Sequence, residues 1–262
     1  LAGPVAGTDA AMDSNTALGY RALTALTTGD ENIAIGYEVL DANTSGYYNT
    51  AVGARALSAN TTGMRNTGVG AWALMSNTTG TENVALGYTL SYNTTGSSNS
   101  ALGHYAMESN TIGNRNVGIG TYVLNTNVTK TESTAVGYEA MRYADSAAGG
   151  AVTYNTALGA YALRGSTTAA NNTGRYNTAL GHSALMSNTA GGSNIAIGTD
   201  AMMFNTTGNQ NIAVGHAALQ ANTIGNYNVA IGYSALISNI SAYGNAAIGR
   251  DSLSATTVGN EN

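Results

Sequence analysis

Residues of the kinds that catalyse reactions are few and dispersed in this sequence. Its three histidines, His104, His182 and His216, each follow a glycine at an equivalent place in a repeated pattern. Imidazoles gathered around a symmetry axis would form a metal or anion site. The three repeats are not adjacent, however, and no carboxylate lies in register with them. We therefore interpret the histidines as surface substitutions.

Other catalytic signatures are missing as well. The serine motif G-x-S-x-G does not occur, and the acidic residues are too scattered to form the carboxylate pair of a glycosidase. The chain has no cysteine, which excludes disulfides and thiolate metal ligands. The sequence thus predicts no catalytic, cofactor-binding or metal-binding residues, and we expect a protein that is not an enzyme.

Two consecutive long segments are the best candidates for binding another molecule. They read RYADSAAGGAVTY (142–154) and RGSTTAANNTGRY (164–176), and each adds five residues to its repeat. Loops on a rigid scaffold often carry binding residues, whereas a repeat array also tolerates surface insertions without function, so both interpretations stand. The candidate surface-recognition residues are Arg142, Tyr143, Asp145, Tyr154, Arg164 and Tyr176.

The scaffold for these loops is a repeat of about seventeen residues, such as NTAVGARALSANTTGMR (49–65). Its first asparagine recurs from Asn15 to Asn262, replaced once by Ser133, and defines fourteen units. The spacings are 17 residues except for one of 16 and two of 22. Residues 1–14 fit no repeat and are expected to be a linker or an N-terminal cap. Residues 15–262 are expected to form one array, with the longer repeats at 133–176.

The pattern within a repeat indicates the fold. The third position is Ala or Gly, the fourth is Val, Ile or Leu, and the fifth is Gly; an apolar pair and an Asn-Thr-Thr-Gly turn follow. Seventeen residues cannot hold the two helices of helical repeats, but they hold short strands and turns. We predict an all-β fold, a parallel β-solenoid (β-roll) of fourteen roughly 17-residue rungs stacked about 4.8 Å apart.

Stacking gives the repeated polar and glycine positions structural tasks. Equivalent asparagines are expected to form an amide ladder, each hydrogen-bonded to its neighbours above and below, and the invariant glycines to form corners. The ladder and corner residues of four successive repeats are Asn32, Asn49, Asn66, Asn83, Gly36, Gly53, Gly70 and Gly87.

The third and fourth positions should point to opposite faces of a strand. We expect the fourth-position side chains to form the core and the small third position to lie against another chain. This arrangement predicts a homo-oligomer, most simply a homotrimer, with its chains intertwined or side by side. The predicted trimer-packing residues are Ala34, Ala51, Ala85 and Ala101.

Composition argues against two other kinds of partner. The net charge is −5, charged residues make up only 9% of the chain, and there is no run of Lys or Arg to bind nucleic acid. No apolar stretch approaches the roughly 20 residues of a membrane-spanning helix, so membrane insertion is not expected. The absence of cysteine is compatible with an extracellular location.

The core of the repeat resembles known sequences. The pattern Asn-x-Ala-[Val/Ile/Leu]-Gly is similar to the head repeats of YadA-like trimeric autotransporter adhesins, as in NIAIG (32–36), NTAVG (49–53), NVALG (83–87) and NVAIG (228–232). The fuller phrase with GY-x-AL and NTTG also resembles bacteriophage tail-fibre repeats that often precede an intramolecular chaperone domain. The adhesin resemblance implies trimers of left-handed β-rolls, although the adhesin repeat is shorter than this one.

The two resemblances imply two functions. The first is a structural segment of a bacteriophage tail fibre, a rigid trimeric shaft or presentation surface of the virion that contacts host-surface glycans or a receptor. The alternative is the head domain of a trimeric autotransporter adhesin on the bacterial cell surface, binding host matrix or cells. A fibre-borne glycan hydrolase is a third hypothesis. A chaperone domain after Asn262 would indicate the fibre, and a stalk with a membrane anchor the adhesin.

Overall fold

The computed structural model describes residues 14–143, 152–168 and 171–262. By its internal contacts the chain forms two compact units, Leu1–Tyr122 and Val123–Asn262. The predicted linker or cap lies outside the described residues, except for residue 14. The regular structure of the described part consists of short strands, one in each repeat, and the fold is all-β as predicted.

Every strand is three residues long and covers the second to fourth positions of its repeat. The first unit contains β1 (Thr16–Leu18), β2 (Ile33–Ile35), β3 (Thr50–Val52), β4 (Thr67–Val69), β5 (Val84–Leu86), β6 (Ser100–Leu102) and β7 (Val117–Ile119). The second unit contains β8 (Thr134–Val136), β9 (Thr156–Leu158), β10 (Thr178–Leu180), β11 (Ile195–Ile197), β12 (Ile212–Val214), β13 (Val229–Ile231) and β14 (Ala246–Ile248).

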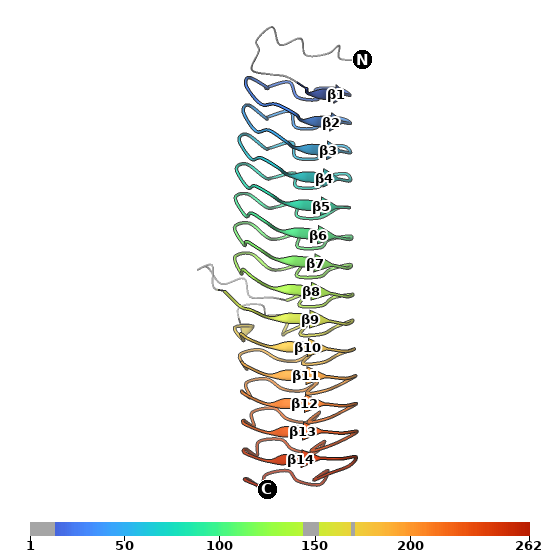
Figure 1. Cartoon of the computed structure of the whole chain (residues 1–262), viewed down its shortest axis with the longest axis vertical. Helices are drawn as coiled ribbons and strands as arrows, with labels where there is room; N and C mark the ends of the chain where they lie inside the picture. Colours follow the sequence, from blue (N-terminus) through green and yellow to red (C-terminus); the bar gives the residue numbers. More distant parts are fainter. Residues whose placement is uncertain (1–13, 144–151, 169–170) are drawn as a thin grey trace. The chain divides into compact units, whose positions relative to one another are not determined.

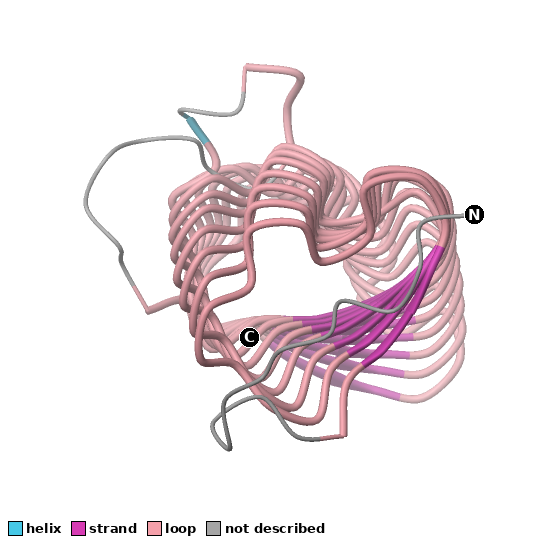
Figure 2. Cartoon of the chain, turned by 90° about the horizontal axis from the view of Figure 1, so that it is seen from above, coloured by secondary structure: helices cyan, strands magenta, loops and turns pink. Residues whose placement is uncertain are grey.

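Within each unit, every strand pairs in parallel with the strand of the next repeat (Figure 1). The register is the one that the repeat dictates: Ala34 is opposite Ala51 in the first unit, and Ala196 is opposite Ala213 in the second. Each repeat is therefore one coil of a parallel β-solenoid, with its strand on one side and turns around the remainder (Figure 2). The predicted solenoid is confirmed.

The turns place non-glycine residues in the left-handed backbone region. In the coil of residues 49–65 these are Arg55, Leu57 and Arg65, with φ of 57°, 52° and 56°. This conformation costs an L-residue on the order of 1 kcal/mol. Each of the three residues donates its backbone N–H to a carbonyl of a neighbouring coil, at 2.8, 3.0 and 3.0 Å respectively. Bonding between coils thus holds a backbone that an isolated turn would not adopt.

The glycine that follows the strand is a corner that admits no side chain. Gly53 has φ +123°, and a Cβ on it would lie 2.6 Å from the carbonyl carbon and oxygen of Gly70 in the next coil. Equivalent corners stack directly on one another. The backbone of the corner glycine in one coil therefore leaves no room for a side chain on the corner residue of the preceding coil. The predicted corners at Gly36, Gly53, Gly70 and Gly87 all have positive φ.

The predicted assignment of the two strand faces is wrong. The third-position residues Ala34, Ala51, Ala85 and Ala101 are at most 2% exposed within a single chain, so they line the interior of their own coils. The fourth position points outward: Leu86 is 37% exposed and Leu102 is 45% exposed. The alanines therefore cannot form contacts between chains. Their small size is required because the opposite wall of the same coil lies against them.

The core of a coil is filled from both walls. In residues 49–65, Ala51 comes from the strand and Ala56 and Leu57 from the facing turn, and all three are fully buried. Asn49 and Asn60 occupy the rest of the interior and are fully buried too. Each coil thus has an apolar side and a side made of amides, which require hydrogen bonds because they have no access to water.

The first-position asparagines form the predicted ladder. The Oδ1 of Asn32 accepts hydrogen bonds from both the backbone N (3.0 Å) and the Nδ2 (3.1 Å) of Asn49. The same Nδ2 also donates to the carbonyl of Gly63 in its own coil, at 2.9 Å. The arrangement is repeated at Asn66 and Asn83, so each amide joins its own coil to the next.

A second amide ladder runs beside the first and was not predicted. It consists of the asparagines of the Asn-Thr-Thr-Gly turns: Asn60 Nδ2 donates to Asn43 Oδ1 at 2.9 Å, and Asn77 Nδ2 donates to Asn60 Oδ1 at 2.8 Å. The carbonyl of Gly63 accepts from Asn60 as well as from Asn49 and so connects the two ladders. The turn motif thus also supplies buried hydrogen bonds.

Candidate functional site

The two long coils in the second unit interrupt both amide ladders. Ser133 replaces the first-ladder asparagine, and its hydroxyl lies 2.6 Å from that of Thr153 instead. Residues 134–154 contain no asparagine, so this coil supplies no residue to the second ladder. The first ladder resumes within the long coils at Asn155, whose Oδ1 accepts from the backbone N of Asn177 at 2.9 Å, and the second ladder resumes at Asn188, which bonds to Asn205.

Lys130 adjoins this interruption. It occupies the turn position at which most repeats have glycine, just before the long coils. At Gly63, the equivalent position of a regular coil, a Cβ would lie 2.3 Å from Asn60 Oδ1 and 2.5 Å from the carbonyl oxygen of Gly80. The coil that follows Lys130 has neither ladder asparagine. Lys130 is 5% exposed, an unusual burial for a lysine.

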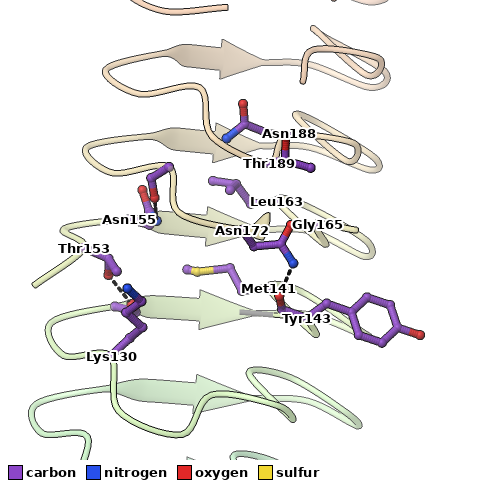
Figure 3. A pocket seen from close by; sticks show the side chains of 12 residues that line it. Lys130, Met141, Tyr143, Thr153, Asn155, Leu163, Gly165, Asn172, Asn188 and Thr189 are labelled. Carbon is purple, nitrogen blue, oxygen red and sulfur yellow. Dashed lines mark hydrogen bonds between the residues drawn. The ribbon is translucent and has the colours of Figure 1, made fainter. Parts of the chain in front are cut away.

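A small cavity lies at the interruption (Figure 3). It has a volume of about 30 Å³ and is lined by Lys130, Ser133, Thr153, Asn155 and Asn188 on its polar side and by Met141 and Leu163 on its apolar side. Such a volume holds roughly two water molecules. Its size suits ordered water that hydrogen-bonds to the lining amides and hydroxyls, and is too small for a sugar residue.

Asn172 joins the two long coils at the edge of this cavity. Its Oδ1 accepts from the backbone N of Ser166 at 2.9 Å, and its Nδ2 donates to the carbonyl of Ser166 at 2.8 Å and to the carbonyl of Tyr143 (Figure 3). The amide therefore fixes the turn of one long coil against the backbone of the other. The sequence did not single out Asn172, because Asn171 is the asparagine of the turn motif that ends at Gly174, and Asn172 takes the place of its first threonine.

Three of the six candidate recognition residues come together around a buried carboxylate. Glu139, whose side chain is 7% exposed, forms ion pairs with Arg142 Nη1 at 2.6 Å and with Arg164 Nε at 2.8 Å. The Tyr143 ring centroid lies 5.1 Å from the guanidinium carbon of Arg142 and 5.3 Å from that of Arg164. Two guanidinium groups and one carboxylate give the cluster a net charge of +1, and the Tyr143 ring lies against both guanidinium groups.

The other candidates lie elsewhere in the coils or outside the described residues. Tyr154 and Tyr176 stack on each other, with ring centroids 5.4 Å apart and ring planes at 20°. Both are exposed, just before the first-ladder asparagines Asn155 and Asn177. Asp145 falls within the residues that are not described. The insertions therefore present an ionic cluster and a separate pair of tyrosines.

The histidines are distributed along the corner that follows the strand. His182 Nδ1 lies 3.0 Å from the hydroxyl of Ser183 and 3.9 Å from Asp200 Oδ1, while the His216 ring stacks on Tyr233. Within residues 14–143, 152–168 and 171–262, no three His, Asp or Glu side chains are grouped so that they could hold a metal ion. In the same part of the chain, no helix has the length and hydrophobicity that a membrane crossing requires.

The same corner carries an ionic network in the first unit. Glu38 receives Arg55 Nε at 2.9 Å and lies 3.9 Å from Arg21 Nη1. The hydroxyl of Tyr37, and after it the nearby guanidinium groups, hold the pKa of Glu38 below its usual range, against the effect of desolvation. The same hydrogen bond, with desolvation and the charge of Glu38, raises the pKa of Tyr37. Burial raises the pKa of Asp41, which pairs with Arg21 at 3.6 Å.

Comparison with known proteins adds no relative to this picture. No family model matches the sequence, and no curated protein matches it either.

Proposed function

We propose that this chain is a structural segment of a bacteriophage tail fibre, a rigid shaft in which three copies associate side by side through the outer faces of their sheets. The observation that carries the proposal is the exposed fourth-position row. It presents Val, Ile or Leu in every coil, among them Val69, Leu86 and Leu102 in the first unit and Leu158, Leu180 and Ile231 in the second.

An uninterrupted apolar row of this kind is normally covered by a partner. A partner that covers the row coil by coil needs contact residues with the same spacing along the solenoid axis. A second copy of this chain has that spacing because its coils are the same. Closed assemblies of identical chains are the usual arrangement for such self-complementary surfaces, and three chains about one axis form a simple closed bundle. A left-handed coil, as the adhesin resemblance implies, is part of the proposal.

The interior of the coil supports a mechanical role. The two amide ladders and the parallel strand pairing tie each coil to the next by several hydrogen bonds, so the solenoid resists bending and local opening. Such a shaft belongs outside the cell, in the virion. It presents its surface, including the Arg142 cluster and the Tyr154–Tyr176 pair, to glycans or a receptor on a host.

Sedimentation equilibrium of the recombinant chain tests the assembly. The wild type is expected at three times the mass of one chain, which is 26.4 kDa. The double variant Leu86→Lys, Leu102→Lys places charges on the apolar row and should sediment as a single folded chain. Thr95→Lys, on an exposed turn, is the matched control and should remain trimeric. A wild-type chain that sediments at 26.4 kDa with intact β circular dichroism would overturn the proposed assembly.

A further inference from the structure

The first unit carries an aromatic cluster that none of the structural roles above accounts for. It lies on the corner after the strand and consists of Trp72, Tyr88, His104, Tyr105 and Tyr122, which we call the aromatic corner. These rings come from four consecutive coils. Trp72 is 40% exposed, His104 is exposed as well, and the three tyrosines are half-buried.

The rings contact one another in succession from coil to coil, with ring planes at 56° for Trp72 and Tyr88, 69° for Tyr88 and Tyr105, and 17° for Tyr105 and Tyr122. Ring centroids are separated by 5.4 Å between Trp72 and Tyr88, 4.9 Å between Tyr88 and Tyr105, and 5.3 Å between Tyr105 and Tyr122. His104 lies beside them, 3.8 Å from the Tyr105 ring. The spacing follows the stacking of the coils, so the rings are held in place by the backbone ladder beneath them.

The single short coil creates the centre of this cluster. Residues 83–98 form the only repeat of 16 residues, and the missing residue falls at the corner, between Tyr88 and Thr89. Tyr88 alone therefore occupies the space that two corner residues fill in a regular coil. It contacts Trp72 from the coil before and Tyr105 from the coil after.

The aromatic corner differs in charge from the same corner in earlier coils. Arg21, Glu38 and Arg55 form the ion-pair network there. In the coils of the aromatic corner, by contrast, the two positions after the glycine hold only Ala71, Trp72, Tyr88, His104, Tyr105, Thr121 and Tyr122, none of which is Asp, Glu, Lys or Arg. A ligand for this surface therefore needs no formal charge.

From these features we infer that the aromatic corner is a binding platform for a neutral glycan chain. This inference rests on the proposed fibre function, because a tail fibre would encounter glycans on the surface of its host. The apolar C–H face of a pyranose ring packs against the electron-rich face of an aromatic ring. Successive sugar rings of an extended chain would lie over successive coils. Tyrosine and tryptophan supply such contact area with little loss of conformational freedom.

Polar groups at the edge of the platform suit the hydroxyl groups of a sugar. Burial, and after it the charge of Glu108, raises the pKa of Tyr88, so its phenol stays protonated and can donate a hydrogen bond. The imidazole of His104 and the hydroxyls of Thr121 and Tyr105 are further donors or acceptors on the same coils.

The distribution of the rings distinguishes this surface from the self-association face. The fourth-position apolar row is present in every coil of both units, as a surface for identical chains requires. Among the described residues, the aromatic corner is the longest run of contacting rings, and its length of four coils suits a ligand of a few sugar units. Shorter runs occupy the same corner in other coils, at Tyr20–Tyr37, Tyr138–Tyr161–His182 and His216–Tyr233.

Fluorescence titration tests the inference directly, because Trp72 is the only tryptophan of the chain. The complete chain is titrated with maltoheptaose, cellohexaose and mannohexaose as probes. At least one is expected to shift the Trp72 emission and to saturate. Tyr105→Ala, which removes a ring but keeps Trp72, should raise the dissociation constant on the order of tenfold.

Controls make every outcome decisive. Tyr233→Ala removes a ring that stacks on His216 in the second unit and should bind the probe as the wild type does. Thermal unfolding establishes that each variant is folded, and Tyr122→Ala replaces Tyr105→Ala if the latter is not. Tyr122→Ala also removes a ring of the aromatic corner and keeps Trp72, so it should weaken binding in the same way.

The inference is overturned if none of the three oligosaccharides gives a saturable change, if Tyr105→Ala binds as tightly as the wild type, or if polysialic acid binds more tightly than the neutral probes. Sedimentation separates this failure from that of the proposed function. If the chain is a trimer and binds no probe, the proposed fibre stands and the glycan platform is rejected. If the chain is a monomer and binds a probe, the glycan platform stands and the trimeric shaft is rejected.

Discussion

Asn66 donates two hydrogen bonds to a single oxygen atom of Asn49: its backbone N lies 3.0 Å and its Nδ2 lies 3.2 Å from Asn49 Oδ1. Both residues are fully buried, so these bonds have no competition from water. The pair is the unit from which the solenoid is built, because the same relationship recurs between the regular coils of each unit. Disturbing it should have a cost larger than that of one ordinary hydrogen bond.

Replacing one ladder asparagine should therefore destabilise the fold strongly. Asn66→Ala removes the oxygen that accepts both N–H groups of Asn83, and it leaves two buried donors without their partner. We expect a loss of about 3 kcal/mol in the free energy of unfolding, measured by chemical denaturation. Asn209→Ala, at an exposed asparagine of a turn, should cost less than about 1 kcal/mol. Equal effects of the two substitutions would show that the ladder contributes no special stability.

Two glycines of one repeat should respond oppositely to alanine. A Cβ on Gly68 in β4 finds its nearest atom at 3.4 Å, and twelve other repeats have alanine there. A Cβ on Gly70, at φ +134°, would lie 2.6 Å from the carbonyl oxygen of Gly87. We expect Gly68→Ala to be neutral or to stabilise by up to about 1 kcal/mol, and Gly70→Ala to destabilise by more than about 2 kcal/mol. Melting temperatures of the two variants check this ranking, and a reversed order would contradict it.

Neighbouring residues of β5 separate folding from association. Ala85 is fully buried, whereas Leu86 is 37% exposed. Ala85→Leu overfills the coil and should lower the free energy of unfolding by about 1–3 kcal/mol. Leu86→Gln should leave the circular dichroism of the coil unchanged and weaken the association of chains, as sedimentation would show. If instead Ala85→Leu weakened association without a loss of stability, the inward placement of Ala85 would be wrong.

The stability of the first unit should depend on pH through Glu38. Its pKa is lower in the folded chain than the usual value of about 4.3, so its ionised form stabilises the fold. That contribution is complete above the unfolded pKa and is lost as the pH falls through the folded pKa. Asp41, whose pKa burial raises, acts in the opposite direction, so a difference between variants is needed.

The comparison of wild type with Glu38→Gln isolates this effect. At pH 7 the variant should melt at a lower temperature than the wild type, and the difference should shrink below about pH 4.3 and vanish once the pH has fallen below the folded pKa of Glu38. Glu31→Gln, at an exposed position, serves as the control. Its melting temperature should differ little from that of the wild type, both at pH 7 and in acid. A difference for Glu38→Gln that persisted unchanged into acid would rule out the carboxylate as its source.

The amino-acid sequence by itself determined the period, the parallel in-register stacking and the ladder of Asn32, Asn49, Asn66 and Asn83. A repeat this short brings each residue over its own counterpart, so the stacked geometry can be inferred from which residue types tolerate or require an identical neighbour. Asparagine satisfies this condition with both its donor and its acceptor, and glycine satisfies it at a corner. The same logic should also have revealed the second ladder, had Asn60 and Asn77 not been explained by their turns.

The tertiary structure alone decided which face of each strand is inside. The alternation of side chains along a strand places the third and fourth positions on opposite faces. Both positions are apolar, so the sequence does not show which of the two faces the interior of the coil. The small third position does face a close neighbour, as predicted, yet that neighbour is the facing wall of the same coil. A Cβ on Gly68 would lie 3.6 Å from the Cβ of Ala73 in its own repeat. Because the coil is so narrow, only alanine or glycine fits inside the strand, and the larger Val, Ile and Leu side chains must point outward.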